Sequence, residues 1–415
     1  MRRAWMLAAV LACAVCAGCI VSFDESLLAD GGPDAAPCNE PLACDGDQLR
    51  GCGRTIEDCH LGCSTDPSPR CRRLVPINGL PSPAGGQSAV LDLSQDALLD
   101  ACTGMVDGAA VAGSAFSNKT QIAGPTIGVL QLRRFHLRQG VVLSVYGGCA
   151  LAIVADGEVE VAGTVDLRGG LNSPYMPGPG GLQGGFVAPA AGCGAGGAGQ
   201  AGLGGGGGGG HAAQGGGGGL GGQGGAVCGD DSQLAGGSGG GSGTCAKAPC
   251  EAGHGGGGGG ALVLVSGERI RVKAGAGINA GGGGGEGGKV GQVGGGGGGA
   301  GGVVVLEAPE HDLDPTAILA LGGGGGGALG TGNASDARGA SGLLGVEAAP
   351  GGAGKADGGV GSSAAVSAGS PGAGDQNGGG GGGGAAGRVR INSSAGSVAL
   401  PKIHGSISQA KVGVK

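Results

Sequence analysis

One stretch of strand-like sequence occurs twice in this chain, and each copy ends in glycine. Residues 149–170, CALAIVADGEVEVAGTVDLRGG, align without a gap with residues 260–281, GALVLVSGERIRVKAGAGINAG, at an offset of 111. Each copy contains three short segments in which apolar residues alternate with other residues, which is the period of a β-strand. Glycine-containing corners separate the segments. Such units are expected to stack, because the edges of one unit are left unpaired until the next unit satisfies them.

The alignment pairs apolar residues with apolar residues. Val159 meets Ile270, and Leu167 meets Ile278. No helical stretch separates the three segments. We therefore predict a mainly β fold, a right-handed parallel β-helix or solenoid in which each repeat hydrogen-bonds to the next at a spacing of about 4.8 Å.

Related sequence occurs at three other places. Residues 301–327 form a third copy whose register is uncertain by one residue, and residues 387–403 form a partial fourth copy. Residues 128–148 have the same character without the glycine run. A leucine-rich repeat is the main rival, but its L-x-x-L-x-L pattern is missing. A β-sandwich would need hairpin signals between the strands.

The same offset makes a prediction about charge. Glu158 falls opposite Arg269, and Glu160 falls opposite Arg271. Neighbouring repeats should therefore place two acids beside two bases on the outer face. Unlike charges that face each other across a sheet contribute ~0.2–1 kcal/mol per pair.

Long glycine-rich segments separate the copies, at about 171–259, 282–300 and 322–386. Glycine supplies 113 of the 415 residues. Each segment should leave the fold at the end of the third strand of a copy, because loop-closure cost rises only slowly with length. Extended glycine chains can pack backbone to backbone, which offsets the entropy lost on ordering them. We expect the first segment, which contains four cysteines, to be partly ordered and residues 322–386 to be less so.

Residues 1–18, MRRAWMLAAVLACAVCAG, predict a secretory signal peptide. Two arginines precede an apolar run that is too short to span a bilayer comfortably. The run ends in CAGC at 16–19, which resembles a bacterial lipobox, so Cys19 is the predicted acylation site. Cys13 is a weaker competing site, and an ordinary cleaved signal is the alternative. Ile20, where some sorting signals have Asp, favours the outer membrane.

Residues 19–37 read as the acylated cysteine and a flexible tether, and residues 38–75 as a disulfide-rich knob. So short a segment buries too little apolar surface to fold without cross-links, and an exported chain can form them. Several connectivities are open. A zinc site is the alternative, although the spacings are unlike CxxC pairs. The six cysteines of the knob are Cys38, Cys44, Cys52, Cys59, Cys63 and Cys71.

Residues 76–127 are predicted to form a connecting or cap segment, and residues 128–415 the solenoid. Six further cysteines lie beyond the knob. With Cys19 acylated and the signal peptide removed, twelve cysteines remain, an even number that can pair completely. The six additional disulfide candidates are Cys102, Cys149, Cys193, Cys228, Cys245 and Cys250.

A β-solenoid can also carry a polysaccharide lyase or hydrolase, which needs clustered acids and bases on one exposed face. Asp312 and Asp314 would share a face of an extended strand, but a solvated strand and a turn explain them as well. The six histidines show no ligand spacing, and glycine-rich motifs arise by chance in this composition. We predict no catalytic residues, no metal and no cofactor. The candidates considered are Arg133, Arg134, His136, Arg138, Asp166, Arg168, Glu310, His311, Asp312 and Asp314.

The chain resembles glycine-rich bacterial surface lipoproteins, which are loosely PE-PGRS-like in composition. The motifs that carry the resemblance are CAGC, the knob sequence CDGDQLRGCGRTIEDCHLGCSTDPSPRC, and the segments GGGGGGALVLVSG, INAGGGGGEGG and GGGGAAGRVRINS. The helical N-terminal domain of PE-PGRS proteins is missing. The resemblance implies a surface location and supplies no catalytic residues.

These observations together predict an exported protein anchored to the outer membrane by lipid, with a structural or adhesive role at the cell surface. A carbohydrate-binding or carbohydrate-cleaving β-helix is the alternative. The net charge of -7 and the scattered lysines and arginines argue against nucleic acid as a partner. The expected partners are the membrane, through the lipid, and extracellular polysaccharide or other surface proteins.

Overall fold

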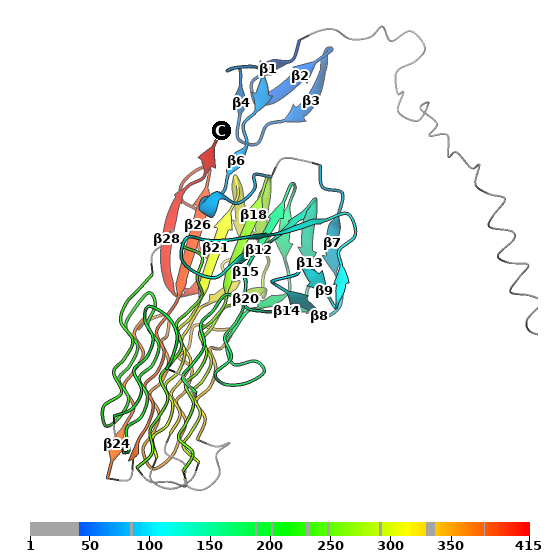
Figure 1. Cartoon of the computed structure of the whole chain (residues 1–415). Helices are drawn as coiled ribbons and strands as arrows, with labels where there is room; N and C mark the ends of the chain where they lie inside the picture. The colour runs from blue at the N-terminus through cyan, green and yellow to red at the C-terminus, as the bar shows by residue number, and fades with distance from the viewer. Residues whose placement is uncertain are drawn as a thin grey trace, which may run out of the picture.

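The computed structural model describes residues 41–83, 86–186, 189–200, 202–229, 233–246, 250–289, 293–328, 337–376 and 378–415. The predicted signal peptide, the tether with Cys19, and Cys38 lie outside these residues. Within them the fold is mainly β, with parallel sheets and one short 3-10 turn, η2 (Ile77–Gly79) (Figure 1).

The knob is a small antiparallel unit held by disulfides. Strands β1 (Ala43–Asp45), β2 (Gln48–Gly51) and β3 (Arg54–Asp58) form one sheet, and β4 (Cys63–Ser64) pairs with β5 (Arg70–Cys71). Disulfides join Cys44 to Cys63 and Cys59 to Cys71, and Cys52 is also disulfide-bonded. Among the described residues of this unit, Leu49 and cysteines make up the buried apolar cluster, so the disulfides stabilise it in place of a larger core.

Three sheets built largely of parallel strands follow the knob. Sheet 1 runs in the order β11 (Ala115–Lys119), β12 (Ile127–Leu132), β15 (Ala150–Ala155), β18 (Ala261–Ser266), β21 (Val303–Glu307), β26 (Arg388–Ser393), β28 (Ser406–Lys411). Sheet 2 comprises β7 (Val90–Leu93), β13 (Arg134–Leu137), β16 (Val159–Val161), β19 (Arg269–Val272) and β22 (Glu310–Leu313). Sheet 3 comprises β10 (Ala109–Ala110), β9 (Met105–Val106), β8 (Ala97–Asp100), β14 (Val142–Tyr146), β17 (Thr164–Asp166), β20 (Gly277–Asn279), β23 (Ile318–Ala320) and β27 (Lys402–His404).

The chain passes through sheets 1, 2 and 3 in the same order four times in succession, starting at β12, β15, β18 and β21. Each strand pairs in parallel with its counterpart in the next repeat. Parallel pairing in fact begins earlier, because β7 and β8 of the predicted connecting segment join sheets 2 and 3. Strands β9 to β11 pair antiparallel at that end.

The register of the two aligned copies agrees with the sequence in two sheets and differs in the third. Val159 pairs with Ile270, as the offset of 111 requires. In sheet 3 it is Val165, and not Leu167, that pairs with Ile278. The corner before β20 contains four residues, 273–276, whereas the corner before β17 contains two. The two extra residues shift the pairing without changing which side chains point inward.

Two buried apolar clusters explain why some strands are continuous apolar runs and others alternate. The larger one contains alternate residues from all three sheets, with Phe135 among its largest fully buried side chains. The second covers the opposite face of sheet 1 and includes Leu74, Leu80, Leu234 and Val412. Both faces of sheet 1 are therefore buried, so its strands are almost unbroken apolar runs, whereas sheet 2 alternates.

The C-terminal strand meets the segment that follows the disulfide-bonded strands of the knob, beside sheet 1. Strand β6 (Leu74–Val75) pairs antiparallel with β29 (Gly413–Val414). The buried carboxylate of Glu307 accepts hydrogen bonds from the Ile77 N–H at 2.9 Å and from Asn392 Nδ2 at 2.6 Å. The segment after the knob is thereby fixed to the sheet by both apolar and polar contacts.

The glycine-rich segments form one bundle of extended chains, and it leaves the sheets where sheet 3 ends (Figure 1). The hydrogen-bond ladder of sheet 3 continues into it. The Leu167 N–H donates to Asn279 O at 2.7 Å, and the Ala280 N–H donates to Ala320 O at 2.9 Å. The base of the bundle is thus a direct extension of the sheet.

Hydrogen bonds in the bundle repeat every three residues. In segment 205–210, successive N–H groups donate in turn to segments 216–219, 295–298 and 194–197, and the order then repeats. Three residues per turn without internal hydrogen bonds is the periodicity of a polyproline II helix. Two other segments follow the same rule: 294–302 donates to 238–244, 379–385 and 280–286, and 379–387 donates to 203–209, 367–373 and 321–327.

All three glycine-rich segments therefore interleave in one lattice. Residues 322–328 and 378–387 are bonded in the same way as the first segment, so the expected contrast in order is not found among the described residues. Glycine fills most of the lattice interior, although Ser238 and Ala300 are also buried there. At Gly297, an added Cβ would overlap the carbonyl oxygen of Gly207. In glycine a Cα hydrogen takes that position and points at the neighbouring segment. The short hairpin β24 (Gly374–Asp375) and β25 (Gly378–Gly379) lies at the far end of the bundle (Figure 1).

Candidate functional site

A row of charged side chains crosses the outer face of sheet 2. The strand register aligns Asp92, His136, Glu160, Arg271 and Asp312 on five neighbouring strands. Acids alternate with basic residues along the row. We call these five residues and the charges that pair with them the charge ladder.

Each step of the ladder is within ion-pair distance. His136 Nδ1 lies 3.5 Å from Asp92 Oδ1, and its Nε2 lies 3.1 Å from Glu160 Oε1. Arg271 Nη1 lies 3.8 Å from Glu160 Oε2, and its Nε lies 3.5 Å from Asp312 Oδ2. Several of these atoms are only partly exposed, so the pairs are less screened than those on an open surface.

Of the two predicted charge pairs, Glu160 with Arg271 is found, whereas Glu158 and Arg269 each lie near another partner. Glu160 is the register partner of Arg271. The nearest guanidinium to Glu158 is also that of Arg271, whose Nη1 lies 2.9 Å from Glu158 Oε1. Arg269 instead faces the next repeat, with Nε 4.0 Å from Glu310 Oε2. The long side chain of Arg271 thus reaches both acids of the preceding repeat.

The ladder favours structural order over catalysis. Lys273 Nζ lies 3.6 Å from Glu160, and Arg138 makes a double contact with Asp92 at 2.9 and 2.7 Å. The Arg138 side-chain hydrogen bond lowers the pKa of Asp92, and the Asp92 hydrogen bond raises that of Arg138. An acid held ionised by an adjacent base is poorly suited to proton transfer at neutral pH. A one-residue slip of any strand would break the alternation, so the ladder helps to specify register.

The two aspartates considered for acid–base chemistry are both occupied. Asp312 faces Arg271. Asp314 accepts hydrogen bonds from the Thr316 hydroxyl at 2.5 Å and from its N–H at 2.7 Å, and these bonds lower its pKa. Asp314 therefore serves as a turn residue. Arg133, just before β13, and Arg134, its first residue, are exposed.

Of two other candidates, Asp166 is buried and His311 is half-buried. Asp166 is 7% exposed where β17 ends, and burial raises its pKa although Arg168 Nε lies 3.2 Å away. His311 follows Ile270 in the inward-facing column of sheet 2. Burial lowers its pKa to about 4, so the ring is neutral at physiological pH. Both ring nitrogens are shielded from solvent.

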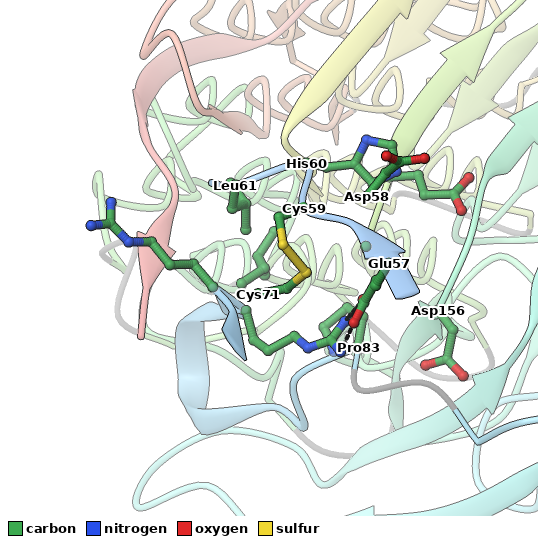
Figure 2. Close-up of a pocket in the computed structure, with 13 residues that line it drawn as sticks. Glu57, Asp58, Cys59, His60, Leu61, Cys71, Pro83 and Asp156 are labelled. Atoms are coloured by element: carbon green, nitrogen blue, oxygen red, sulfur yellow. Dashed lines mark hydrogen bonds and ion pairs between the residues drawn. A yellow bond between two sulfur atoms is a disulfide. The ribbon is translucent and has the colours of Figure 1, made fainter. Parts of the chain in front are cut away.

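A cleft of about 280 Å³ lies between the knob and the turns that follow sheet 1 (Figure 2). Its walls carry Glu57, Asp58, Asp156 and Glu268, beside the Cys59–Cys71 disulfide in the same lining. Most of these acids have partners. Arg73 Nη1 lies 2.7 Å from Glu57, Gln48 Nε2 donates to Asp58 at 2.9 Å, and the Gln87 N–H donates to Asp156 at 3.0 Å. These three acids therefore offer no free pair of carboxylates in the cleft.

The described residues contain no group of three or more His, Cys, Asp or Glu side chains placed to hold a metal ion. Nor does any helix in the described ranges have the length and apolarity to cross a membrane.

The six cysteines beyond the knob form three disulfides, which join Cys102 to Cys149, Cys193 to Cys228, and Cys245 to Cys250.

Sequence reasoning missed part of the ladder. Asp92 lies in VLDL at 90–93, inside the segment that we had assigned to a connection. The alternation of that tetrapeptide was the available signal, and it resembles FHL at 135–137, with which it pairs. No protein-family model, curated protein or solved structure matches this chain.

Proposed function

We propose that the chain is an exported, lipid-anchored protein of the cell-envelope surface with a structural or adhesive role. The observation that carries the proposal is the glycine bundle, in which backbone groups of three distant segments satisfy one another. A lattice of this kind gives rigidity and a broad surface, and it supplies few side chains for chemistry. In Figure 1 it lies at the opposite end of the molecule from the knob.

The three sheets support the proposal if they form one closed, right-handed parallel β-helix, which is the architecture we infer. The constant order of the sheets and the single apolar cluster that all three share favour it. Parallel crossovers are right-handed in nearly all proteins. Stacked parallel repeats contact only their neighbours and give a stiff, elongated body, which suits a support for the bundle.

Export is supported by the disulfides. Five described pairs join cysteines of the knob, the sheets and the bundle. Stable disulfides of this density are typical of proteins outside the cytosol. Together with the predicted signal peptide and the lipobox-like sequence at Cys19, they favour attachment to the outer membrane.

The position of the knob in the chain indicates how the molecule would be oriented at the membrane. The described chain begins in the knob at residue 41, and 21 residues separate Cys19 from it. That length spans at most ~75 Å when fully extended. A lipid on Cys19 would therefore hold the knob near the membrane and leave the bundle to project away from it.

Acylation can be tested in living cells with an alkyne-tagged fatty acid. The wild-type chain should take up the label and fractionate with the outer membrane, and Cys19→Ser should lose both. Cys13→Ser is the matched control and should keep the label. Label on Cys19→Ser, or an unlabelled wild-type chain, would contradict the lipid anchor.

The role itself is tested by deletion. Cells that lack the chain should cohere or attach to surfaces less well, and the wild-type chain should restore the behaviour whereas Cys19→Ser should not. External protease should also cleave the wild-type chain on intact cells. Unchanged cohesion and attachment, together with protection from protease, would exclude a surface role.

A further inference from the structure

Three of the chain's few aromatic or imidazole rings gather on the glycine bundle. The rings of Tyr175 and Phe186 are stacked, with centroids 4.9 Å apart and planes 6° from parallel. The His254 ring stands edge-on to both, at 4.2 Å from Phe186 and 5.9 Å from Tyr175. The ring–ring contacts found in the described part of the chain are these three. We call these residues, with Glu286 and Lys289, the aromatic patch.

The backbone holds the patch rigidly. The Gly184 N–H donates to Tyr175 O at 3.0 Å, and the Gly255 N–H donates to Gly185 O at 2.8 Å. The Glu286 N–H donates to His254 O at 2.8 Å. The patch is thus built from three separate segments that belong to one lattice. Its rings are positioned in advance, which lowers the entropy cost of binding a ligand.

Charged groups lie beside the rings. His254 Nδ1 is 2.6 Å from Glu286 Oε2, and Lys289 Nζ is 3.8 Å from Glu286 Oε1. Lys289 also lies 3.9 Å from Glu251 Oε2. Among these groups the Glu251 side chain is 66% exposed and that of Lys289 is 34% exposed. The Glu251 carboxylate and the Lys289 ammonium therefore reach solvent, and Glu286, which is 19% exposed, links them to His254 of the ring cluster.

The apolar part of the patch is not fully covered. Phe186 remains 44% exposed and the adjoining Met176 45%. A ring pair needed only to pin segment 174–186 to the bundle would be expected to bury both faces, because the gain from apolar contact scales with the area removed from water. Exposed rings beside hydrogen-bonding groups are the ordinary composition of a binding surface.

We propose that the aromatic patch binds pyranose units of an extracellular polysaccharide. A pyranose ring has an apolar C–H face that stacks on an aromatic ring, and a rim of hydroxyl groups that carboxylates and ammonium groups bind. The stacking of one sugar unit on one exposed ring is a weak contact. A polymer offers many identical units, and several anchored copies of the chain raise the effective affinity. This inference rests on the proposed surface location and gives the adhesive role a ligand.

The test uses the full chain, purified in detergent, and a panel of neutral, acidic and amino-sugar polysaccharides in affinity electrophoresis. At least one polysaccharide should retard the wild-type chain. Phe186→Ala should weaken that binding at least tenfold, and Tyr175→Phe, which keeps the ring, should preserve it. Tyr146→Ala is the matched control, because Tyr146 is a 45% exposed aromatic residue on β14, outside the patch.

Glu286→Gln provides a second variant of similar shape, and it should weaken binding. Its thermal unfolding temperature is measured alongside, because the substitution also removes the charge that pairs with His254 and Lys289. No retardation by any polysaccharide, or equal retardation of wild type and Phe186→Ala, would overturn the inference. Release of reducing ends would also overturn it as stated, because it would show cleavage. A chain that is acylated and surface-exposed but binds no sugar refutes the patch alone. Sugar binding by a chain that is never acylated refutes the anchor alone.

Discussion

At the residue scale, Gly207 is a position that accepts only glycine. An added Cβ would overlap the carbonyl oxygen of Gln223 in a neighbouring segment. We expect Gly207→Ala to destabilise the bundle by about 1–3 kcal/mol, the usual cost of overpacking a filled site. In a mobile loop the same change would stabilise the chain by about 0.4–1 kcal/mol, because alanine lowers the entropy of the unfolded state. Calorimetry and amide hydrogen exchange show whether Gly207→Ala lowers or raises the free energy of unfolding.

Gly345→Ala is the matched control for that prediction. Nothing lies within 4 Å of the position that its Cβ would take, so the change in the free energy of unfolding should stay within about 0.5 kcal/mol. If both variants behave alike, the dense packing around Gly207 is not present in solution.

The charge ladder can be tested at Arg271. Its guanidinium lies within 4 Å of Glu158, Glu160 and Asp312. Arg271→Met keeps the apolar stem and removes the charge, and we expect it to cost about 1–2 kcal/mol, since each such pair contributes up to about 1 kcal/mol. Arg269→Met, which loses one pair at 4.0 Å, should cost less than half as much. The difference should shrink in 1 M salt, and a difference that is independent of salt would assign the effect to packing.

At the element scale, His311 makes strand β22 sensitive to acid. The folded state holds the pKa of this ring at about 4 because the ring is buried, whereas the unfolded value is about 6.5. Below pH 6.5 the unfolded chain therefore binds a proton that the folded chain does not. Stability should fall by about 2–3 kcal/mol as the pH drops from 6.5 to 4, and the fall should level off within about one pH unit below 4.

His311→Leu tests this dependence, because leucine suits the inward column that contains Ile270. Urea unfolding of wild type and variant between pH 4 and 7 should show a flatter profile for the variant. Burial raises the pKa of Glu307 and gives the opposite trend, but it is common to both proteins and cancels in the comparison. Parallel profiles would show that the ring is protonated in the folded state.

The strands and most of their register follow from the sequence, because alternation and the offset of 111 residues are carried by side chains. The pairing of Val159 with Ile270 is one example. The pairing of Ile278 was missed because two residues were added at a corner, where no side-chain pattern marks them. The second apolar face of sheet 1 could have been inferred from the run ALVLVS at 261–266, which does not alternate.

The bundle could not be predicted in the same way. Glycine has no side chain, so a run such as 204–210 carries no side-chain pattern from which its neighbouring segments could be predicted. The partners are fixed by three-dimensional geometry: segment 205–210 donates to residues near 195, 217 and 297. The aromatic patch escaped notice for a related reason. Tyr175, Phe186 and His254 come together only once the lattice is formed.

At the scale of the whole molecule, the bundle should unfold as one unit. Segment 379–387 is central, since it donates hydrogen bonds to segments 203–209, 321–327 and 367–373 and accepts them from 295–301. Removing it would leave buried backbone groups without partners in all of these segments, which proteins avoid at a cost of about 1–3 kcal/mol per group. Cooperative loss is therefore favoured over separate fraying.

The double variant Gly381→Ala with Gly384→Ala tests this cooperativity, because the added Cβ atoms would overlap the carbonyl oxygens of Gly296 and Gly299. Hydrogen exchange should increase at least tenfold in residues 203–209 and 294–302 as well as at the mutated segment. Strands β15 and β18 should keep their protection, since the apolar cluster of the sheets is untouched. If protection were lost only near residue 381, the glycine-rich segments would be independent loops attached to the sheets, and the bundle would not transmit rigidity from the knob side to its far end.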